Sequence, residues 1–337
     1  MNSLIKKFKD IDQGHTCETY VMLESITQKT AKNGSYYVEL TLSDGESCVI
    51  ARKFETQAIS LRNMGIIEPC VVRVCLNVSN YNGSRSYIVH HIAPGDDVSL
   101  KLDDFIMKAP IDPEETFNKL IENIKSSYID NDLDELFIPI ADLAVGILIE
   151  NKREFIRAAA AKNIHHNVIG GLLYHSATMA EQAIKVTETY PGLDSEILIS
   201  GCALHDIGKI KEMQTTITGK TEYTKDGRLL GHSAIGIMMV EEAANRLGFF
   251  DLERVSLLQH MIASHHGLLE YGAIVTPAIP EAIVLHALDM VDSKVYVFDE
   301  VYKDLDVGAL SNNIYALNNT SVYRACSLTP VEKITSK

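Results

Sequence analysis

Between residues 16 and 92, apolar and polar side chains alternate in short runs rich in Val, Ile, Tyr and Thr, a pattern typical of half-buried strands. The five runs are CETYVMLESITQKT, SYYVELTLSD, CVIARKF, PCVVRVCLNVSNY and SRSYIVHHIA. Asn-Gly and Asp-Gly dipeptides, which favour tight hairpin turns, lie between runs at residues 33–34, 44–45 and 82–83. A more helical stretch at residues 55–64 separates the third run from the fourth. This order predicts a five-stranded β domain with one helix inside it.

Five short strands in this order suit a small Greek-key barrel such as an OB-fold. The helical stretch falls between the third and fourth strands, which is where an OB-fold usually has its helix. A generic β-sandwich is the alternative, because it is also built from short alternating strands. We expect the OB-fold-like β-barrel.

After residue 112 the apolar positions recur at helical spacing, and this pattern continues to about residue 305. The first helix begins at Asp112-Pro113, which supplies an N-cap carboxylate and a proline at the first helical position. The change of period predicts a β-then-α, multi-domain chain of four segments. These are an OB-fold-like domain at 1–95, a helical linker at 96–134, an all-α helical bundle at 135–310 and a C-terminal tail at 311–337.

The composition, with 46% hydrophobic and 23% charged residues, is ordinary for a globular protein. No apolar run approaches the roughly 20 residues that cross a bilayer. The six cysteines form no CxxC pair and no spacing typical of a disulfide framework. We therefore expect reduced thiols and a cytoplasmic protein.

The net charge of −14 is unevenly placed along the chain. Residues 1–95 hold ten Lys and Arg against nine Asp and Glu, so the remaining residues carry −15. Because binding to a polyanion normally depends on neutralising its phosphates, the first segment is the better candidate to bind nucleic acid.

Nine of the twelve histidines fall between residues 165 and 286. Several lie within or at the ends of predicted helices, together with two aspartates. In chain order these positions are His175, His205-Asp206, His232, His265-His266 and Asp289. Imidazole and carboxylate groups are ligands for Mn²⁺, Fe²⁺ and Zn²⁺, and metal sites in helical bundles collect them from separate helices.

Each of these residues is weak evidence when taken singly. A lone His175 or His232 in an apolar helix is more often a hydrogen-bonded core histidine than a ligand. His265-His266 also suits an exposed helix C-terminus, where a cationic imidazole is favoured. Asp289 lies on an apolar helical face, where an unpaired buried carboxylate is costly. The ordered series across five predicted helices therefore indicates a metal site.

At this level of detail the chain resembles a known family. The matching stretches are AAAAKNIHHNVIGGLLYHSATM, ALHDIGKI, LLGHSAIG, LLQHMIASHHG and LHALDMVDSK, which together span most of residues 150–300. With HDIGK at residues 205–209, this series is similar to the HD-domain superfamily of metal-dependent phosphohydrolases. More narrowly, the chain resembles the YhaM family of 3′→5′ exoribonucleases, which join an N-terminal OB-fold to an HD domain. That resemblance identifies residues 135–310 as an HD phosphohydrolase domain.

The resemblance also implies a ligand set. His175, His205, Asp206 and Asp289 are expected to bind one metal ion. Asp206 would bridge to a second ion held by His232 and His265, with His266 as a further candidate. We expect two divalent ions, with Mn²⁺ first and Co²⁺, Fe²⁺ or Mg²⁺ as alternatives.

Four further residues near this series are candidates for catalysis or support. Lys209, one helical turn after His205, is expected to contact phosphate oxygens, and the alternative is a solvated lysine at a helix end. His165 and His166 suit phosphate contacts or leaving-group acids, and equally a helix-capping region. Asp292 is expected to support a ligand or contact substrate.

Aromatic and basic residues in the β domain suggest a face that binds nucleic acid. The segment VSNYNGSRSYIV offers Tyr81, Arg85 and Tyr87, and Tyr36 and Tyr37 follow the first hairpin signal. The alternative for each tyrosine is packing within the barrel. The chain contains no Trp, so any stacking on bases depends on Tyr or Phe.

We expect a metal-dependent 3′→5′ exoribonuclease that releases nucleoside 5′-monophosphates from single-stranded RNA. The expected partners are single-stranded RNA, single-stranded DNA as a second possibility, and further copies of the chain in a homo-oligomer. One alternative is a phosphohydrolase acting on nucleotides or cyclic dinucleotides, although the GYP signature of cyclic-di-GMP phosphodiesterases is missing after His265-His266. Another is an OB-fold nucleic-acid-binding protein without catalysis.

Overall fold

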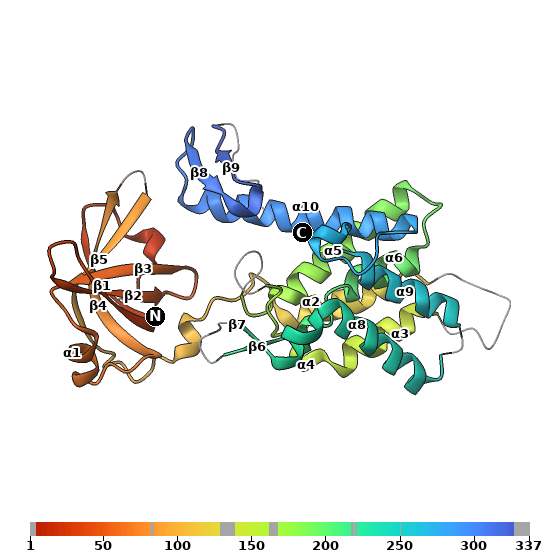
Figure 1. Ribbon diagram of the computed structural model, residues 1–337, viewed down its shortest axis with the longest axis horizontal. Coiled ribbons are helices and arrows are strands. Elements are labelled where there is room, and N and C mark those ends of the chain that lie inside the picture. Colours follow the sequence, from red (N-terminus) through yellow and green to blue (C-terminus); the bar gives the residue numbers. More distant parts are fainter. Residues whose placement is uncertain are drawn as a thin grey trace. The chain divides into compact units, whose positions relative to one another are not determined.

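The structure is a computed structural model that falls into two compact units (Figure 1). It describes residues 5–81, 84–128, 139–161, 168–216, 219, 221–249 and 251–326. The first unit comprises Met1–Lys108 with Ile217–Gly219, and the second comprises Ala109–Thr216 with Lys220–Lys337. The segment after residue 95 therefore belongs with the β domain, and one reason is that buried Phe105 accepts a hydrogen bond through its carbonyl from Ser43 Oγ at 2.6 Å.

The first unit is a closed barrel with the strand order β1-β2-β3-β5-β4. Its elements are β1 (Thr16–Thr30), β2 (Tyr36–Ser43), β3 (Cys48–Phe54), α1 (Ala58–Asn63), β4 (Cys70–Tyr81) and β5 (Ser84–Pro94). The pairing of β3 with β5 is parallel, whereas the other strand pairs are antiparallel. A five-stranded Greek-key barrel with a helix between β3 and β4 is an OB-fold. The predicted barrel is confirmed, and the sandwich alternative is excluded.

Alternation along the strands fills the barrel interior, since every second side chain points inward. On β2, Val38, Leu40 and Leu42 are fully buried. The turn after β2 is held by the buried Asp44 carboxylate, which accepts hydrogen bonds from the backbone N–H groups of Phe8 at 2.6 Å and Ser47 at 2.7 Å. The N-terminal segment is thereby attached to the barrel.

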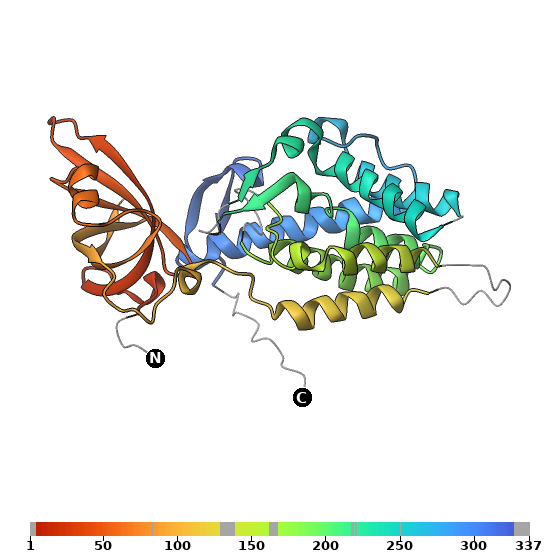
Figure 2. The same cartoon turned by 90° about the horizontal axis from the view of Figure 1, so that it is seen from below.

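The second unit is mainly helical. Its helices are α2 (Pro113–Lys125), α3 (Ile140–Glu150), α4 (Lys152–Phe155), α5 (Gly171–Thr189), α6 (Ser195–Leu204), α7 (Lys209–Glu212), α8 (Lys225–Leu247), α9 (Leu252–Ser264) and α10 (Pro280–Asp304). A small hairpin of β6 (Met213–Thr215) and β7 (Thr221–Tyr223) lies between α7 and α8. Helix α10 packs against α5, α6 and α9 (Figure 2).

Helix α2 begins as the sequence predicts, because Asp112 caps it by accepting a hydrogen bond from the Glu115 N–H at 2.9 Å. However, α2 does not act as a separate linker. Its buried Phe117, Leu120 and Ile124 side chains belong to the core shared by the other helices. Helical periodicity showed that this face is apolar but did not identify which domain covers it.

The chain also forms structure within the predicted tail. Strands β8 (Leu310–Ile314) and β9 (Thr320–Tyr323) pair as a hairpin after α10. Val297 of α10 packs with Leu317 and Val322 in a small core of its own. In the described part of the chain, no helix is both long and apolar enough to span a membrane.

Candidate metal centre

Separate helices deliver the histidines and aspartates of the predicted series to one place. His175 is in the second turn of α5, and His205 caps the C-terminus of α6 immediately before Asp206. Gly208 allows α8 to approach closely, because a Cβ at Gly208 would lie 2.0 Å from the carbonyl oxygen of His232. His265 caps the C-terminus of α9.

On one side of Asp206, two imidazoles and a second carboxylate converge. The Nε2 atoms of His175 and His205 are 3.2 Å apart. Asp206 Oδ2 lies 3.3 Å from His205 Nε2, and Asp289 Oδ1 lies 3.4 Å from His175 Nε2. These four residues form one potential ligand set, consistent with a grouping of His175, His205 and Asp206 that offers donor atoms within 4.8 Å of one another.

The other oxygen of Asp206 faces a second group of imidazoles. Asp206 Oδ1 lies 3.5 Å from His232 Nε2 and 3.8 Å from His265 Nε2. The two Nε2 atoms of His232 and His265 are 3.4 Å apart. His266 completes this group, since donor atoms of His232, His265 and His266 also lie within 4.8 Å of one another. Asp206 therefore stands between two clusters, with one oxygen toward each.

The outer nitrogens of the histidines are held by hydrogen bonds. His205 Nδ1 donates to the Cys202 carbonyl at 3.0 Å, and His265 Nδ1 donates to the Ile262 carbonyl at 2.7 Å. A carbonyl oxygen only accepts, so Nδ1 carries a proton in both rings, and Nε2 is the nitrogen left for a metal ion. Both Nε2 atoms face Asp206, which is the side on which a metal ion would bind.

Carboxylates hold the outer nitrogens of the other two ligands. His175 Nδ1 is 2.6 Å from Asp292 Oδ2, and His232 Nδ1 is 3.2 Å from Glu212 Oε1. Glu212 Oε1 also accepts from the backbone N–H of His232 at 3.1 Å. Asp292 thus supports His175, and Glu212 fixes both the backbone and the ring of His232.

The arrangement fits divalent cations. Asp206 Oδ1 is buried and accepts no hydrogen bond from any residue that the structure describes. A buried carboxylate oxygen without a partner is costly, and a cation placed between Asp206 and the imidazole lone pairs would satisfy it. The donors are imidazole nitrogens and carboxylate oxygens, which suit Mn²⁺, Fe²⁺ and Zn²⁺.

The charges of the site are strongly coupled. Burial opposes ionisation of Asp206, but the Lys209 ammonium, with Nζ 2.6 Å from Asp206 Oδ2, and His205 hold the pKa of Asp206 well below its usual value. Burial by itself would lower the pKa of His175, but its hydrogen bonds to Asp289 and Asp292 outweigh burial and raise that pKa to about 9. Asp206 is therefore ionised at neutral pH, and the imidazole of His175 is cationic in the metal-free protein.

The structure brings together the predicted ligands and two of the predicted supporting residues. The ligands are His175, His205, Asp206, His232, His265, His266 and Asp289. Lys209 contacts Asp206, and Asp292 contacts His175. His165 and His166 lie outside the described residues. Sequence reasoning missed Glu212, because nothing in the sequence links it to His232, which follows 20 residues later.

In the barrel, two of the predicted nucleic-acid contacts have other partners. Tyr87 is only 9% exposed, and the centroids of its ring and the Phe8 ring are 5.6 Å apart. Tyr87 therefore packs within the barrel, which was the alternative to a contact with bases. Arg85 donates through Nη2 to the Ile11 carbonyl at 2.6 Å. The side chain of Tyr81 is outside the described part of the structure.

The other two predicted tyrosines lie at the start of β2. Tyr36 is exposed, and Tyr37 pairs in register with Phe54 of β3, where the two rings are 5.8 Å apart. Phe54 is also exposed and was not predicted. Among the described side chains of the barrel, Tyr36, Tyr37 and Phe54 therefore remain as candidates for stacking on bases, and Tyr81 stays a prediction.

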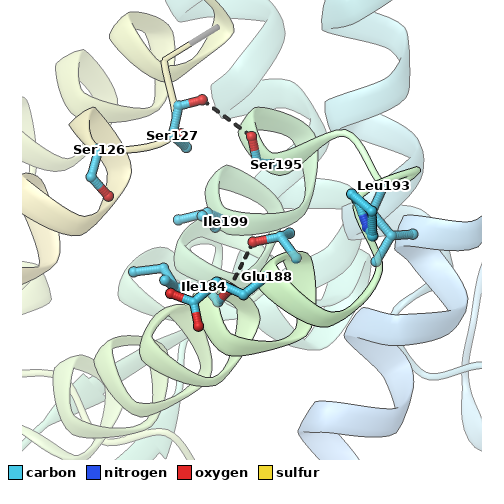
Figure 3. A pocket seen from close by; sticks show the side chains of 9 residues that line it. Ser126, Ser127, Ile184, Glu188, Leu193, Ser195 and Ile199 are labelled. Atoms are coloured by element: carbon cyan, nitrogen blue, oxygen red, sulfur yellow. Dashed lines mark hydrogen bonds between the residues drawn. The ribbon is translucent and has the colours of Figure 1, made fainter.

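A hollow of about 390 Å³ lies elsewhere in the helical unit, at the ends of α2, α5 and α6 (Figure 3). Ser195 Oγ donates to the Ser127 carbonyl at 3.2 Å on its wall. Its lining, among the residues that the structure describes, contains Glu188 but no histidine, lysine or arginine. It has one carboxylate and no imidazole cluster or cationic side chain, so we place the candidate active site at the histidine cluster.

Comparison with known proteins agrees with this geometry. The family model described as HD domain matches residues 172–294, a range that contains every ligand from His175 to Asp289. The fold and the site thus define a protein that joins an OB-like barrel to an HD domain. The 3′-5′ exoribonuclease YhaM of Bacillus licheniformis is 31% identical, over 92% of this chain and 95% of that protein. Its counterpart in Bacillus subtilis is 30% identical over the same shares. The chain belongs to the YhaM family of 3′-5′ exoribonucleases.

Among solved structures, the second OB-fold domain of replication protein A from Methanococcus maripaludis matches 28% of this chain and 98% of that domain. The identity is 13% and the TM-score is 0.22. The assignment of the barrel as an OB-fold rests on its strand order and on the position of α1.

Proposed function

We propose that the protein is a 3′→5′ exoribonuclease with a dinuclear metal centre, and that it degrades single-stranded RNA to nucleoside 5′-monophosphates. One observation carries this proposal. The two oxygens of Asp206 face two different imidazole clusters, with His205 Nε2 3.3 Å from Oδ2 and His232 Nε2 3.5 Å from Oδ1. A carboxylate between two donor sets is the arrangement that bridges two cations.

His175, His205, Asp206 and Asp289 would hold one ion. Asp206, His232 and His265 would hold the other, with His266 beside them. Two such ions supply a nucleophile from water at neutral pH and stabilise the charge on the phosphoryl group. We propose Mn²⁺ for both positions, because mixed imidazole and carboxylate sets suit it.

The protein's own side chains prepare the site for this chemistry. Glu212 and Asp292 orient His232 and His175, so that the coordinating nitrogens are fixed before substrate arrives. Lys209 has three N–H donors, of which Asp206 accepts one, and we propose that the others contact phosphate oxygens. His165 and His166 stay candidates for contacts with phosphate or the leaving group.

The barrel is the proposed RNA-binding domain. Its aromatic side chains Tyr36, Tyr37 and Phe54 provide flat apolar surfaces on which bases stack without sequence preference. The charge distribution supports this role, because residues 1–95 carry a net charge of +1 and the rest of the chain carries −15. A narrow single strand suits such a surface, whereas an A-form duplex hides its bases.

The deciding experiment uses single-stranded RNA labelled at its 5′ end, with Mn²⁺ and with or without EDTA. We expect a ladder that shortens from the 3′ end, unlabelled mononucleotides as product, and no cleavage with EDTA. Early release of the labelled nucleotide would reverse the polarity, and internal fragments would indicate an endonuclease. Cleavage of a cyclic dinucleotide but not of RNA would replace the proposal with a phosphodiesterase for small substrates.

A further inference from the structure

Large apolar side chains are exposed on both sequence segments that flank the second imidazole cluster. Leu229 and Leu230 directly precede Gly231 and His232, and Leu229 is 70% exposed. After His265 and His266, the exposed residues are Leu268, Leu269, Tyr271, Ile274 and Val275. We call these seven residues the apolar rim. Tyr271 is 61% exposed and is its only aromatic member.

The two segments of the rim are connected to neighbouring histidines of the metal centre. The rings of His232 and His266 are 5.2 Å apart. The loop that carries Tyr271 lies against His266, because a Cβ at Gly272 would be 3.2 Å from His266 Nδ1. Gly231 has a φ of 73°, which kinks α8 between the exposed leucines and His232.

Backbone hydrogen bonds hold the Tyr271 loop in place. The Tyr271 N–H donates to the Leu268 carbonyl at 3.0 Å and closes the short 3₁₀ helix Leu269–Tyr271. The Ile274 N–H donates to the Ala263 carbonyl at 2.9 Å, so the end of the loop is attached to α9. Tyr271 therefore stands on a fixed backbone while its side chain is exposed.

An exposed apolar surface beside a charged centre indicates a ligand with matching parts. The metal centre suits an anionic phosphate, and the rim suits a flat apolar group joined to it. A nucleotide has both parts. Glu270 lies between Leu269 and Tyr271 in the sequence, and Arg228, which is exposed, directly precedes Leu229, where it suits the next phosphate of a chain.

We propose that Tyr271, the aromatic residue of the apolar rim, is the platform on which the base of the 3′-terminal nucleotide stacks. This proposal rests on the proposed exoribonuclease function and adds a subsite to it. Stacking on Tyr271 holds the last nucleotide so that its phosphate meets the metal centre. Because every base has an apolar face, the platform accepts all four bases.

The test combines enzyme variants with altered RNA. Tyr271→Ala is compared with Tyr271→Phe on two single-stranded RNAs, one ordinary and one whose 3′-terminal nucleotide lacks its base. On ordinary RNA, we expect Tyr271→Ala to lower kcat/KM by about 5- to 100-fold, and Tyr271→Phe to stay near wild type. On the abasic RNA, wild type and Tyr271→Ala should be equally slow, because the base that stacks is missing.

Tyr190→Ala provides a matched control. Tyr190 is 62% exposed and caps the C-terminus of α5, 15 residues after His175, which is about 22 Å along a helix. The Tyr190→Ala variant should cut each RNA at the wild-type rate. Bound Mn²⁺ should be the same in all variants, which separates lost stacking from a damaged metal centre.

Two results would overturn the platform. The first is an equal loss on both RNAs in Tyr271→Ala, since the effect would then not depend on the base. The second is a wild-type dimer in sedimentation that Tyr271→Ala converts to a monomer, since the rim would then be a contact between copies. In either case the wild-type enzyme still cuts single-stranded RNA, so the proposed exoribonuclease function stands. A wild-type enzyme that cuts no RNA removes both proposals.

Discussion

His175 Nε2 and His205 Nε2 lie 3.2 Å apart, although the two residues come from different helices and each has its other nitrogen hydrogen-bonded. His205 Nδ1 donates to the Cys202 carbonyl, so Nε2 is the nitrogen that faces His175. Two lone pairs at this distance would repel, and a proton or a metal ion between them removes the repulsion. The pKa of His175 is raised by its hydrogen bonds to Asp289 and Asp292, so in the metal-free protein His175 is the ring that carries the extra proton.

This relationship predicts that metal binding releases a proton. The pKa of His175 is raised from 6.5 to about 9, so near pH 7 its Nε2 is protonated until a metal displaces the proton. Apparent Mn²⁺ affinity should fall as the pH drops below about 9. Calorimetric titrations in buffers of different ionisation enthalpy would measure the release. Asp292→Asn should reduce the number of protons released, because Asp292 helps to raise the pKa of His175. Binding heats that do not depend on the buffer would contradict the protonation of His175.

Asp206→Asn is expected to abolish hydrolysis while the protein stays folded. The variant keeps the shape of the side chain but loses the charge that faces both imidazole clusters. We expect turnover in Mn²⁺ to fall by about 10³-fold or more, which corresponds to several kcal/mol. Circular dichroism would verify the fold, and near-native turnover would remove the bridging role.

His232→Ala is expected to lose one of two bound metal ions together with activity. His232 belongs to only one of the two clusters, so the cluster with His175 should stay occupied. Metal analysis after dialysis measures the stoichiometry. His260→Ala is the matched control, because His260 lies in α9 and its Nε2 accepts from the Ala278 N–H at 2.9 Å. The same stoichiometry in His232→Ala and wild type would argue against a dinuclear centre.

Glu212→Ala is expected to weaken binding of the second ion by about 10- to 100-fold, because His232 loses the acceptor for its ring and its backbone N–H. Activity should recover as Mn²⁺ is raised. Glu212→Gln keeps an acceptor oxygen and should be milder. Glu222→Ala on β7, where the side chain is exposed, is the control. A loss of turnover that high Mn²⁺ leaves unchanged would count against a positioning role.

The double variant Tyr37→Ala/Phe54→Ala is expected to weaken binding of long single-stranded RNA by about 5- to 100-fold for each base that stacks there. Hydrolysis of a dinucleotide should change little, because so short a substrate need not reach the barrel. Ile59→Ala, at an exposed position of α1, is the control. Equal losses on both substrates would mean that the aromatic pair is structural.

Much of the fold follows from local sequence patterns. Alternation of period two predicted β1 to β5, and Asn-Gly or Asp-Gly signals marked their turns, because strand faces and turns depend on neighbouring residues. Asp112 marked the start of α2 for the same reason. The pattern did not assign α2 to the helical core or Tyr87 to the barrel interior. An apolar face can be buried against different partners, and the local sequence does not specify which one.

The ligand series was also present in the sequence, because metal chemistry limits the residue types that suit each position. The sequence did not show which atoms of these residues face one another. Which oxygen of Asp206 faces which cluster, and the support of His232 by Glu212, depend on contacts between residues far apart in the chain. Phe54 became a neighbour of Tyr37 only through the register of β2 and β3. A hydrogen bond needs its donor and acceptor at one distance and angle, and only the packed helices and strands determine these.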